Sequence, residues 1–268
     1  MQLKELIQKT DMTLYNYLKG QSLKVHQSKQ KELLQVINGQ TKLENITSDK
    51  INSYIEHLQN KNNSNKTINA KLSYIRNILR YAHNMGWTKS IPYIKNLKTK
   101  SNKITRYYSE LEQDLMLEWS KHHCYVLYEA LVIGFNTGLR ISDILTIINN
   151  INSIKIENNY IHLLIQKTQT ELSIPLNKHL QELTQDWQEY KINYMQIQYL
   201  FKKMLKEINI LDADATIHKI RHTFCSRLVE KGVPLPVIQK LAGHKKITTT
   251  MLYTHVKDTQ LEQAVALL

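Results

Sequence analysis

A break in the hydrophobic pattern between Lys95 and Tyr108 limits the possible folds of this chain more than any other feature. Five basic residues and no acidic residue occur in this stretch, namely Lys95, Lys98, Lys100, Lys103 and Arg106. A polar, one-sign stretch between two periodic regions is typical of a linker. The 268 residues are enough for two modest domains. We therefore predict a first domain at residues 1–94, a basic linker at residues 95–103 and a second domain at residues 104–268.

The first domain has the periodicity of a small helical bundle. From Thr67 onward, apolar residues recur at spacings of three and four, at Ile68, Leu72, Ile75, Leu79 and Ala82. Gly86 is placed to end this helix. A shorter helix around Tyr54 follows two capping candidates, Thr47 and Ser48. Earlier amphipathic stretches near Leu14–Leu18 and Leu33–Ile37 bring the expected number of helices to about four.

The second domain mixes helices with a few strands. Helical patterns run from Ser109 to Ser120 and from Cys124 to Asn136; Gly138 ends the second, and Ser142 is a candidate cap for the next. Short strands are expected at Ser153–Glu157, Tyr160–Thr168 and Glu171–Leu176, with a tight turn at Asn158-Asn159. Helical patterns return at Tyr194–Ile208, Lys219–Lys231 and Pro236–Leu241. The fold class is therefore mainly α, with an α+β second domain that holds a small antiparallel sheet.

Positive charge is concentrated in the first hundred residues. They contain 17 Lys and Arg against 6 Asp and Glu, a balance of +11, whereas the rest of the chain has a balance of only +2. This asymmetry favours a domain that grips a nucleic-acid backbone. Lys71, Arg76 and Arg80 lie largely off the apolar stripe, so we predict that they contact DNA phosphates. A solvated lysine surface, in a chain rich in Asn and Ile, remains the alternative.

The composition argues against several other classes of protein. Cys124 and Cys225 form neither a CxxC pair nor a disulfide framework. The N-terminus has no apolar signal region, and no apolar run approaches the length of a membrane span. We expect a cytoplasmic protein without a membrane partner.

Four short segments of the second domain contain the candidate catalytic groups. In chain order they are Thr137-Gly138-Leu139-Arg140-Ile141-Ser142-Asp143, His218-Lys219-Ile220-Arg221-His222, Leu241-Ala242-Gly243-His244, and Tyr253 nine residues later. They supply two guanidiniums, several proton-transfer groups and a phenol. Arginine binds phosphate with two parallel hydrogen bonds and stabilises charge that develops on its oxygens. A phosphodiester needs this combination if a protein nucleophile is to open it without a metal.

This pattern resembles the tyrosine recombinase (phage integrase) family, over nearly the whole chain. The resemblance implies that Arg140 and Arg221 clamp the scissile phosphate and that His244 donates a further hydrogen bond. Tyr253 would be the nucleophile, and His218 would assist removal of its proton, since a phenol has a pKa near 10. Two further residues are implied: Lys167, in the strand turn, would protonate the departing 5′ oxygen, and Asp143 would orient the site. This turn departs from the family in having Gln169-Thr170 where a glycine is common.

The resemblance also implies a reaction and its partners. The helical first domain and the α+β second domain would close around double-stranded DNA. The protein would cut the DNA through a 3′-phosphotyrosyl intermediate and exchange strands through a Holliday junction. The protein would act as a homo-tetramer on two recombination sites and as a monomer in solution, without metal or other cofactor. Mobile-element integration and dimer resolution both fit. The apolar positions of Leu261–Leu268 suggest a tail that packs either on a neighbouring protomer or in cis.

Three other interpretations fit parts of this pattern. The chain could be a catalytically silent DNA-binding protein of the same fold, which the complete catalytic set argues against. It could relax DNA as a type IB topoisomerase does, although the small helical first domain favours a recombinase. His218 and His222 are spaced like zinc ligands, but a zincin helix would need Glu where Lys219 stands.

Overall fold

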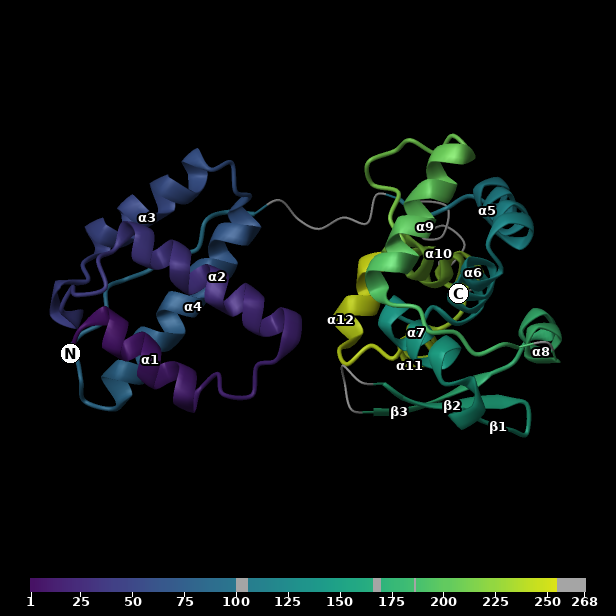
Figure 1. Cartoon of the computed structure of the whole chain (residues 1–268), viewed down its shortest axis with the longest axis horizontal. Helices are drawn as coiled ribbons and strands as arrows, with labels where there is room; N and C mark the ends of the chain where they lie inside the picture. The colour runs from purple at the N-terminus through teal and green to yellow at the C-terminus, as the bar shows by residue number, and fades with distance from the viewer. Residues whose placement is uncertain (100–105, 166–169, 186, 255–268) are drawn as a thin grey trace, which may run out of the picture. The chain divides into compact units, whose positions relative to one another are not determined.

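The computed structural model describes residues 1–99, 106–165, 170–185 and 187–254. The chain divides into two compact units, Met1–Ser101 and Asn102–Leu268, so the division falls inside the predicted linker (Figure 1). The described helices include none long and apolar enough to cross a membrane.

Unit 1 is a bundle of four α-helices around one apolar core. The helices are α1 (Leu3–Thr13), α2 (Gly20–Val36), α3 (Ser48–Asn60) and α4 (Asn65–Asn84), with a 3-10 turn, η1 (Leu43–Asn45), before α3. The predicted stripe of α4 is confirmed, since Ile68, Leu72 and Ala82 are fully buried. Gly86 adopts a left-handed φ of +72° just after the helix ends.

Two details of unit 1 differ from the sequence prediction. Leu14–Leu18 is not a helix; the first helix, α1, lies before it and ends at Thr13. Thr10 interrupts the apolar pattern of α1, yet it is buried because its hydroxyl donates to the carbonyls of Leu6 and Ile7. Thr47 occupies the N-cap of α3 without a capping hydrogen bond from its side chain.

The chain that follows α4 is fixed to that helix. The side-chain amide of Asn69 accepts from the backbone N–H of Leu97 at 2.8 Å and donates to its carbonyl at 2.9 Å. Arg76 Nε donates to the carbonyl of Ile94 at 3.1 Å, and Asn65 donates to that of Lys98. The first residues of the predicted linker therefore belong structurally to unit 1.

Unit 2 places helices beside one small sheet. Its elements are α5 (Glu110–His123), α6 (Tyr125–Thr137), α7 (Ile141–Asn149), η2 (Ile151–Ser153), β1 (Lys155–Glu157), β2 (Tyr160–Ile165), β3 (Thr170–Pro175), α8 (Lys178–Gln185), α9 (Tyr194–Glu207), α10 (His218–Glu230), α11 (Leu235–Ala242), α12 (Ile247–Thr250) and η3 (Met251–Tyr253). Helix α6 is buried along most of its length and forms the centre of the core. Helix α8 was not predicted from the sequence. Only two of its eight residues, both leucines, are buried, so it has few apolar positions that would mark a helix.

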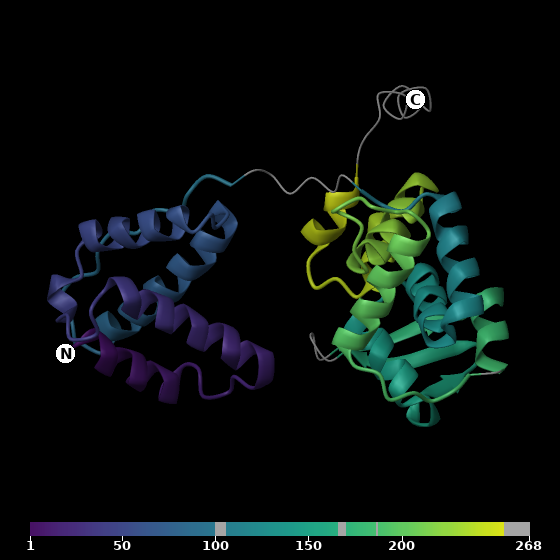
Figure 2. The same cartoon turned by 45° about the horizontal axis from the view of Figure 1, so that its top comes forward.

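The predicted antiparallel sheet is confirmed. Its strand order is β1-β2-β3, and the sheet lies at one edge of unit 2 in both views (Figure 1 and Figure 2). Ile161 pairs with Ile174 and Leu163 with Leu172, and all four side chains are buried. Asn158 and Asn159 both adopt positive φ, which is the conformation that a two-residue hairpin turn requires.

Candidate active site

The turn between α6 and α7 places Arg140. Gly138 ends α6 with a left-handed φ of +65°, and a Cβ at this position would lie 2.2 Å from the ring of Phe224. Only glycine satisfies both conditions. Thr137 closes the turn by accepting from the backbone N–H of Leu139. Arg140 is then the N-cap of α7, a position that the sequence analysis assigned to Ser142.

Arg221 lies on α10 and is 3% exposed. Its Nη1 donates to the carbonyl of Gly138 at 2.7 Å, so the turn that places Arg140 also fixes Arg221. Its Nη2 is buried and has no hydrogen-bond partner among the described residues. A guanidinium nitrogen is rarely left in this condition, because an unsatisfied buried donor costs about 1–3 kcal/mol.

Arg140 and Arg221 repel one another electrostatically. The pKa of Arg221 is lowered, first by burial and then by the like charge of Arg140. Asp143, which is 4% exposed in the first turn of α7, acts in the opposite direction and favours the charged guanidinium. An anion bound beside both arginines would relieve their repulsion.

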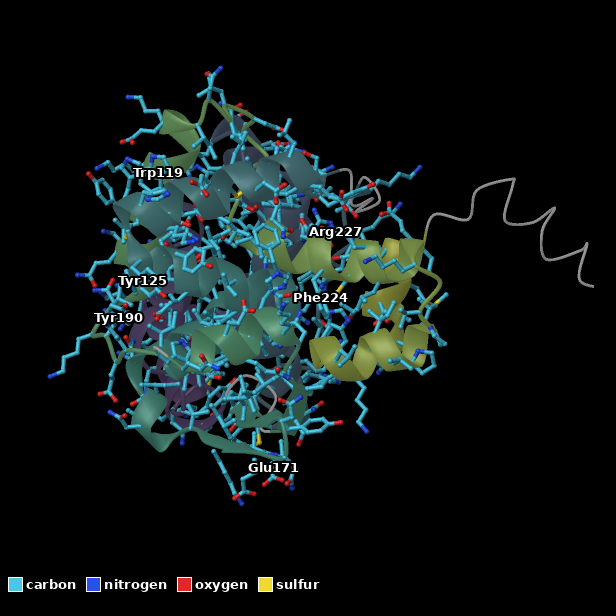
Figure 3. The ribbon with its side chains drawn as sticks, turned by 90° about the vertical axis from the view of Figure 1, so that its right-hand side faces the viewer. Trp119, Tyr125, Glu171, Tyr190, Phe224 and Arg227 are labelled. Carbon is cyan, nitrogen blue, oxygen red and sulfur yellow. The ribbon has the colours of Figure 1, made fainter. Side chains whose placement is uncertain are left out.

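Helix α10 is fixed from its other side by the segment that enters unit 2. The backbone N–H of Tyr108 donates to Thr223 Oγ1 at 2.9 Å, and Arg227 donates to the carbonyl of Tyr108 at 3.2 Å. Phe224 and Arg227 lie on successive turns of α10 (Figure 3). The helix that contains Arg221 is thus held at several points along its length.

Tyr253 is buried in the free protein. It ends the 3-10 turn η3, is 5% exposed, and packs with Cys225, Ile238 and Ala242. Its hydroxyl and the Cys225 thiol share a hydrogen bond. The pKa of Tyr253 is raised, mainly by burial and further by Cys225, while the charge of Arg221 opposes this effect.

His244 follows α11 through a second left-handed glycine. Gly243 has a φ of +62°, and the next residue, His244, is 7% exposed. Its Nδ1 lies 2.9 Å from Thr250 Oγ1, and its ring is parallel to that of Tyr253, with centroids 6.1 Å apart. Burial, followed by the charges of Arg221 and Arg140, lowers the pKa of His244 to about 4.

His218 and His222 follow one another along the same helix. His218 is exposed, whereas His222 is partly buried. Their rings meet edge to face with centroids 4.9 Å apart, and the ring of His222 lies 5.4 Å from that of Tyr253. Sequence reasoning weighed His222 only as a zinc ligand; its position one helical turn after His218 was the available signal. No group of three His, Cys, Asp or Glu side chains in the described part of the chain could hold a metal ion.

Other predicted residues lie elsewhere. Lys167 falls outside the described residues. In unit 1, Lys71 forms an ion pair with Glu32 at 2.5 Å, and Arg76 is bonded to Ile94 and Asn96. Arg80 is exposed.

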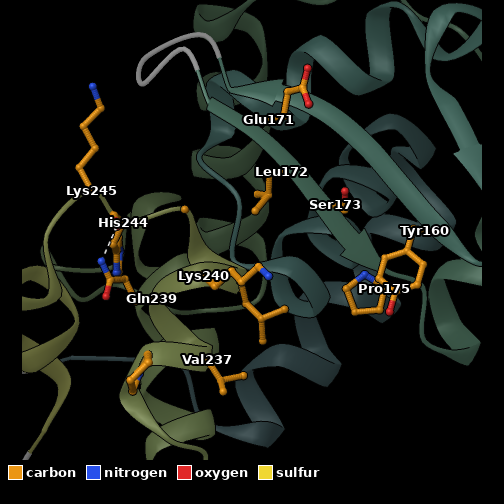
Figure 4. A pocket seen from close by; sticks show the side chains of 13 residues that line it. Tyr160, Glu171, Leu172, Ser173, Pro175, Val237, Gln239, Lys240, His244 and Lys245 are labelled. Carbon is orange, nitrogen blue, oxygen red and sulfur yellow. Dashed lines mark hydrogen bonds between the residues drawn. The ribbon is translucent and has the colours of Figure 1, made fainter.

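A pocket of about 840 Å³ opens beside His244 (Figure 4). It lies between β3, represented by Leu172 and Pro175, and α11, represented by Val237 and Lys240. Gln239 donates from its side chain to the carbonyl of His244 in the lining of the pocket. The site is therefore open to a large ligand on the side of the sheet.

Comparison with known proteins identifies the family. The profile of the phage integrase family matches residues 100–260, and that of the phage integrase SAM-like domain matches residues 2–102. The chain belongs to the phage integrase family of tyrosine recombinases. It is 27% identical to the tyrosine recombinase XerD of Rickettsia prowazekii, over 82% of each chain. It is 30% identical to XerC of Caldanaerobacter subterraneus, over 52% of this chain and 43% of the relative.

Solved structures show the same fold. The Tn1549 transposon integrase in complex with circular intermediate DNA superposes with a TM-score of 0.76, at 19% identity and over 100% of both chains. A lambda integrase dimer bound to a core site gives 0.76 at 17% identity, over 96% of this chain and 100% of that one. The predicted fold class, an N-terminal helical unit followed by a mixed catalytic unit, is thereby confirmed.

Proposed function

We propose that Tyr253, Arg140, Arg221, His218 and His244 cut and rejoin DNA in this site-specific recombinase. The single observation that supports this assignment best is the guanidinium of Arg221. It is 3% exposed, lies beside a second arginine and has a nitrogen without a partner in the described structure. Such a group is complementary to a phosphate oxygen that has left water.

The chemistry follows from the charge of the two arginines. The Tyr253 oxygen attacks phosphorus, the P–O5′ bond breaks, and a 3′-phosphotyrosyl link forms. Arg140 and Arg221 stabilise the charge on the non-bridging oxygens, and His244 donates a further hydrogen bond. Lys167 protonates the departing 5′ oxygen. Attack by a 5′ hydroxyl of the partner duplex reverses these steps, so the energy of the phosphodiester is conserved in the covalent intermediate.

Tyr253 must move before it can react. Its hydroxyl is bonded to the Cys225 thiol and is buried with apolar neighbours. Because burial raises the pKa of the phenol, it is a poor nucleophile in this position. We infer that assembly on DNA draws Tyr253 away from Cys225.

Double-stranded DNA is the partner that the charge distribution favours. Solved structures show lambda integrase as a dimer bound to a core site and as a tetramer bound to a Holliday junction. Another shows the XerH recombinase bound to its difH substrate. By analogy, we propose that this chain works as a tetramer on two recombination sites. Within unit 1, Arg80 is the best candidate of the three predicted phosphate contacts, because Lys71 and Arg76 already have protein partners.

Two biological settings fit the proposed reaction. Relatives include Xer recombinases and the integrase of Escherichia phage 186. Mobile-element integration and resolution of chromosome dimers use the same residues, so the active site does not distinguish them. We keep the prediction of a cytoplasmic protein.

Covalent trapping tests the proposal. Duplexes that bind the protein are first selected from a random-sequence pool, and a nick is placed near the cleavage point so that the cut strand diffuses away. The wild type should form a protein–DNA adduct that Tyr253→Phe does not form. An adduct that maps to Tyr107, Tyr108 or another tyrosine would contradict the assignment. Joining of two marked duplexes, in place of relaxation alone, separates a recombinase from a topoisomerase.

A further inference from the structure

His222 links two of the proposed catalytic side chains. Its ring lies 4.9 Å from that of His218 on the same helix and 5.4 Å from that of Tyr253, which is contributed by η3. These are centroid distances of rings in contact. His222 therefore occupies the position between the solvent-exposed histidine and the buried nucleophile.

The buried nitrogen of His222 has no partner. Its Nδ1 is shielded from solvent and makes no hydrogen bond among the described residues. His244 differs, since its Nδ1 already bonds to Thr250. A buried polar atom in this condition is unfavourable by about 1–3 kcal/mol, which suggests a partner that arrives in a later state.

The imidazole of His222 is uncharged at neutral pH. Burial, followed by the charges of the neighbouring His218, Lys219 and Arg221, lowers its pKa to about 4. Tyr253 faces it from η3. A neutral imidazole has one nitrogen that can accept a hydrogen bond. A phosphate bound to the arginines would add negative charge nearby and so would raise the proton affinity of this ring.

Cys225 is a poor acceptor for the hydroxyl proton of Tyr253. A thiol is a weak hydrogen-bond acceptor, and burial raises the pKa of Cys225 to about 11. When Tyr253 turns toward the phosphate, its hydroxyl leaves this thiol and needs another acceptor.

We propose that Nδ1 of His222 accepts the hydroxyl proton of Tyr253 during its attack on the phosphate. This inference rests on the proposed function. The O–H bond of Tyr253 breaks and its proton moves to Nδ1, the bond from the Tyr253 oxygen to phosphorus forms, and the P–O5′ bond breaks. The departing 5′ oxygen takes its proton from Lys167. His218, on the solvent side of the ring, supports the protonated His222, and the reverse reaction returns the proton.

Three substitutions of His222 test this role. His222→Phe keeps a ring but has no acceptor; His222→Asn places an amide atom near the position of Nδ1; His222→Gln places it near Nε2. Single-turnover adduct formation is measured on the trapping duplex, together with DNA affinity. We expect His222→Phe to slow adduct formation by about 10²-fold or more, and His222→Asn to be about tenfold faster than Phe or Gln. Affinity should stay within about threefold in all variants.

The controls separate this inference from the proposed function. The exposed His122→Phe should leave the rate unchanged. If the wild type forms no adduct, or if Tyr253→Phe still does, the proposed function is wrong. If the wild type reacts and His222→Phe reacts within about threefold of it, only the role of His222 is wrong. Equal rates for the Asn and Gln variants would also overturn it, and this comparison holds even if the Phe variant does not fold.

Discussion

The hydroxyl of Tyr253 and the thiol of Cys225 share a hydrogen bond inside an apolar cluster formed with Ile238 and Ala242. Cys225 lies one helical turn after Arg221 on α10. The same helix therefore presents the guanidinium that we propose binds the phosphate and retains the proposed nucleophile in a buried position. We therefore expect the free protein to be unreactive until the tyrosine is released.

Removal of the thiol should ease this release. In Cys225→Ala the Tyr253 hydroxyl would be buried without a partner, a condition that costs about 1–3 kcal/mol. The buried position of the Tyr253 side chain becomes less favourable relative to a released one, so adduct formation should accelerate by up to about tenfold. The thermal stability of the protein should fall. Cys225→Ser, which keeps a hydrogen-bonding group, is the matched control. Slower adduct formation by Cys225→Ala at unchanged DNA affinity would show that the thiol assists catalysis.

Arg140 and Arg221 should affect chemistry more than binding. Each is one of many phosphate contacts, so Arg→Ala at either position should leave affinity within about tenfold. Cleavage should fall by about 10²-fold or more, as when a donor to a developing oxyanion is lost. Arg140→Lys should recover little activity, because an ammonium cannot reproduce the two parallel hydrogen bonds. Quench-flow cleavage at saturating DNA separates the two effects; normal cleavage with weak binding would reverse these roles.

Chelation should not stop the reaction. In the proposed mechanism, the two guanidiniums supply the positive charge that a metal ion supplies in other phosphoryl-transfer enzymes. Strand transfer in EDTA should therefore continue at a rate within about threefold of the untreated rate, by the same charge argument. Loss of adduct formation in EDTA that added Mg²⁺ restores would contradict a mechanism based on Arg140 and Arg221 alone.

Glu129 should make the protein less stable as pH rises. It is fully buried in α6, and burial raises its pKa to about 7, although the Gln188 backbone and the Tyr190 hydroxyl offset part of this effect. Between about pH 4.5 and 7 the folded state binds more protons than the unfolded state, so folding stability falls through this interval. Glu129→Gln should gain up to about 3 kcal/mol relative to wild type between pH 4.5 and 8. Denaturant unfolding at both pH values measures this gain, and the exposed Glu118→Gln should show none.

The sequence predicted what depends on local pattern. Gly86 and Gly138 marked the ends of α4 and α6, and Asn158-Asn159 marked the hairpin, because each backbone conformation favours that residue type. The α4 stripe followed from periodicity. Contacts between distant segments were not accessible in the same way. Neither the bond from Arg221 to Gly138 nor the burial of Tyr253 against Cys225 leaves a periodic signal. The pairing of Lys71 with Glu32 likewise joins residues from two helices, and it weakens the expectation that this lysine meets DNA.

Arg80 and Lys71 provide a matched test of how unit 1 holds DNA. Each phosphate contact releases about one counterion, so its loss should reduce the slope of log affinity against log salt by about one. Arg80 is exposed, and we expect Arg80→Gln to produce this change in the full chain without altering stability.

Lys71 is 15% exposed and is paired with Glu32, whose pKa it lowers despite the opposing effect of burial. Lys71→Gln should therefore change the slope by less than about half a unit and should lower the unfolding temperature, since it leaves the mostly buried carboxylate of Glu32 with only the more exposed and more distant Lys61 as its ion-pair partner. Fluorescence anisotropy at several salt concentrations measures both slopes. A full unit lost in Lys71→Gln and none in Arg80→Gln would mean that DNA displaces Glu32 from Lys71, and that the α4 surface around Lys71 is the one that binds the phosphates.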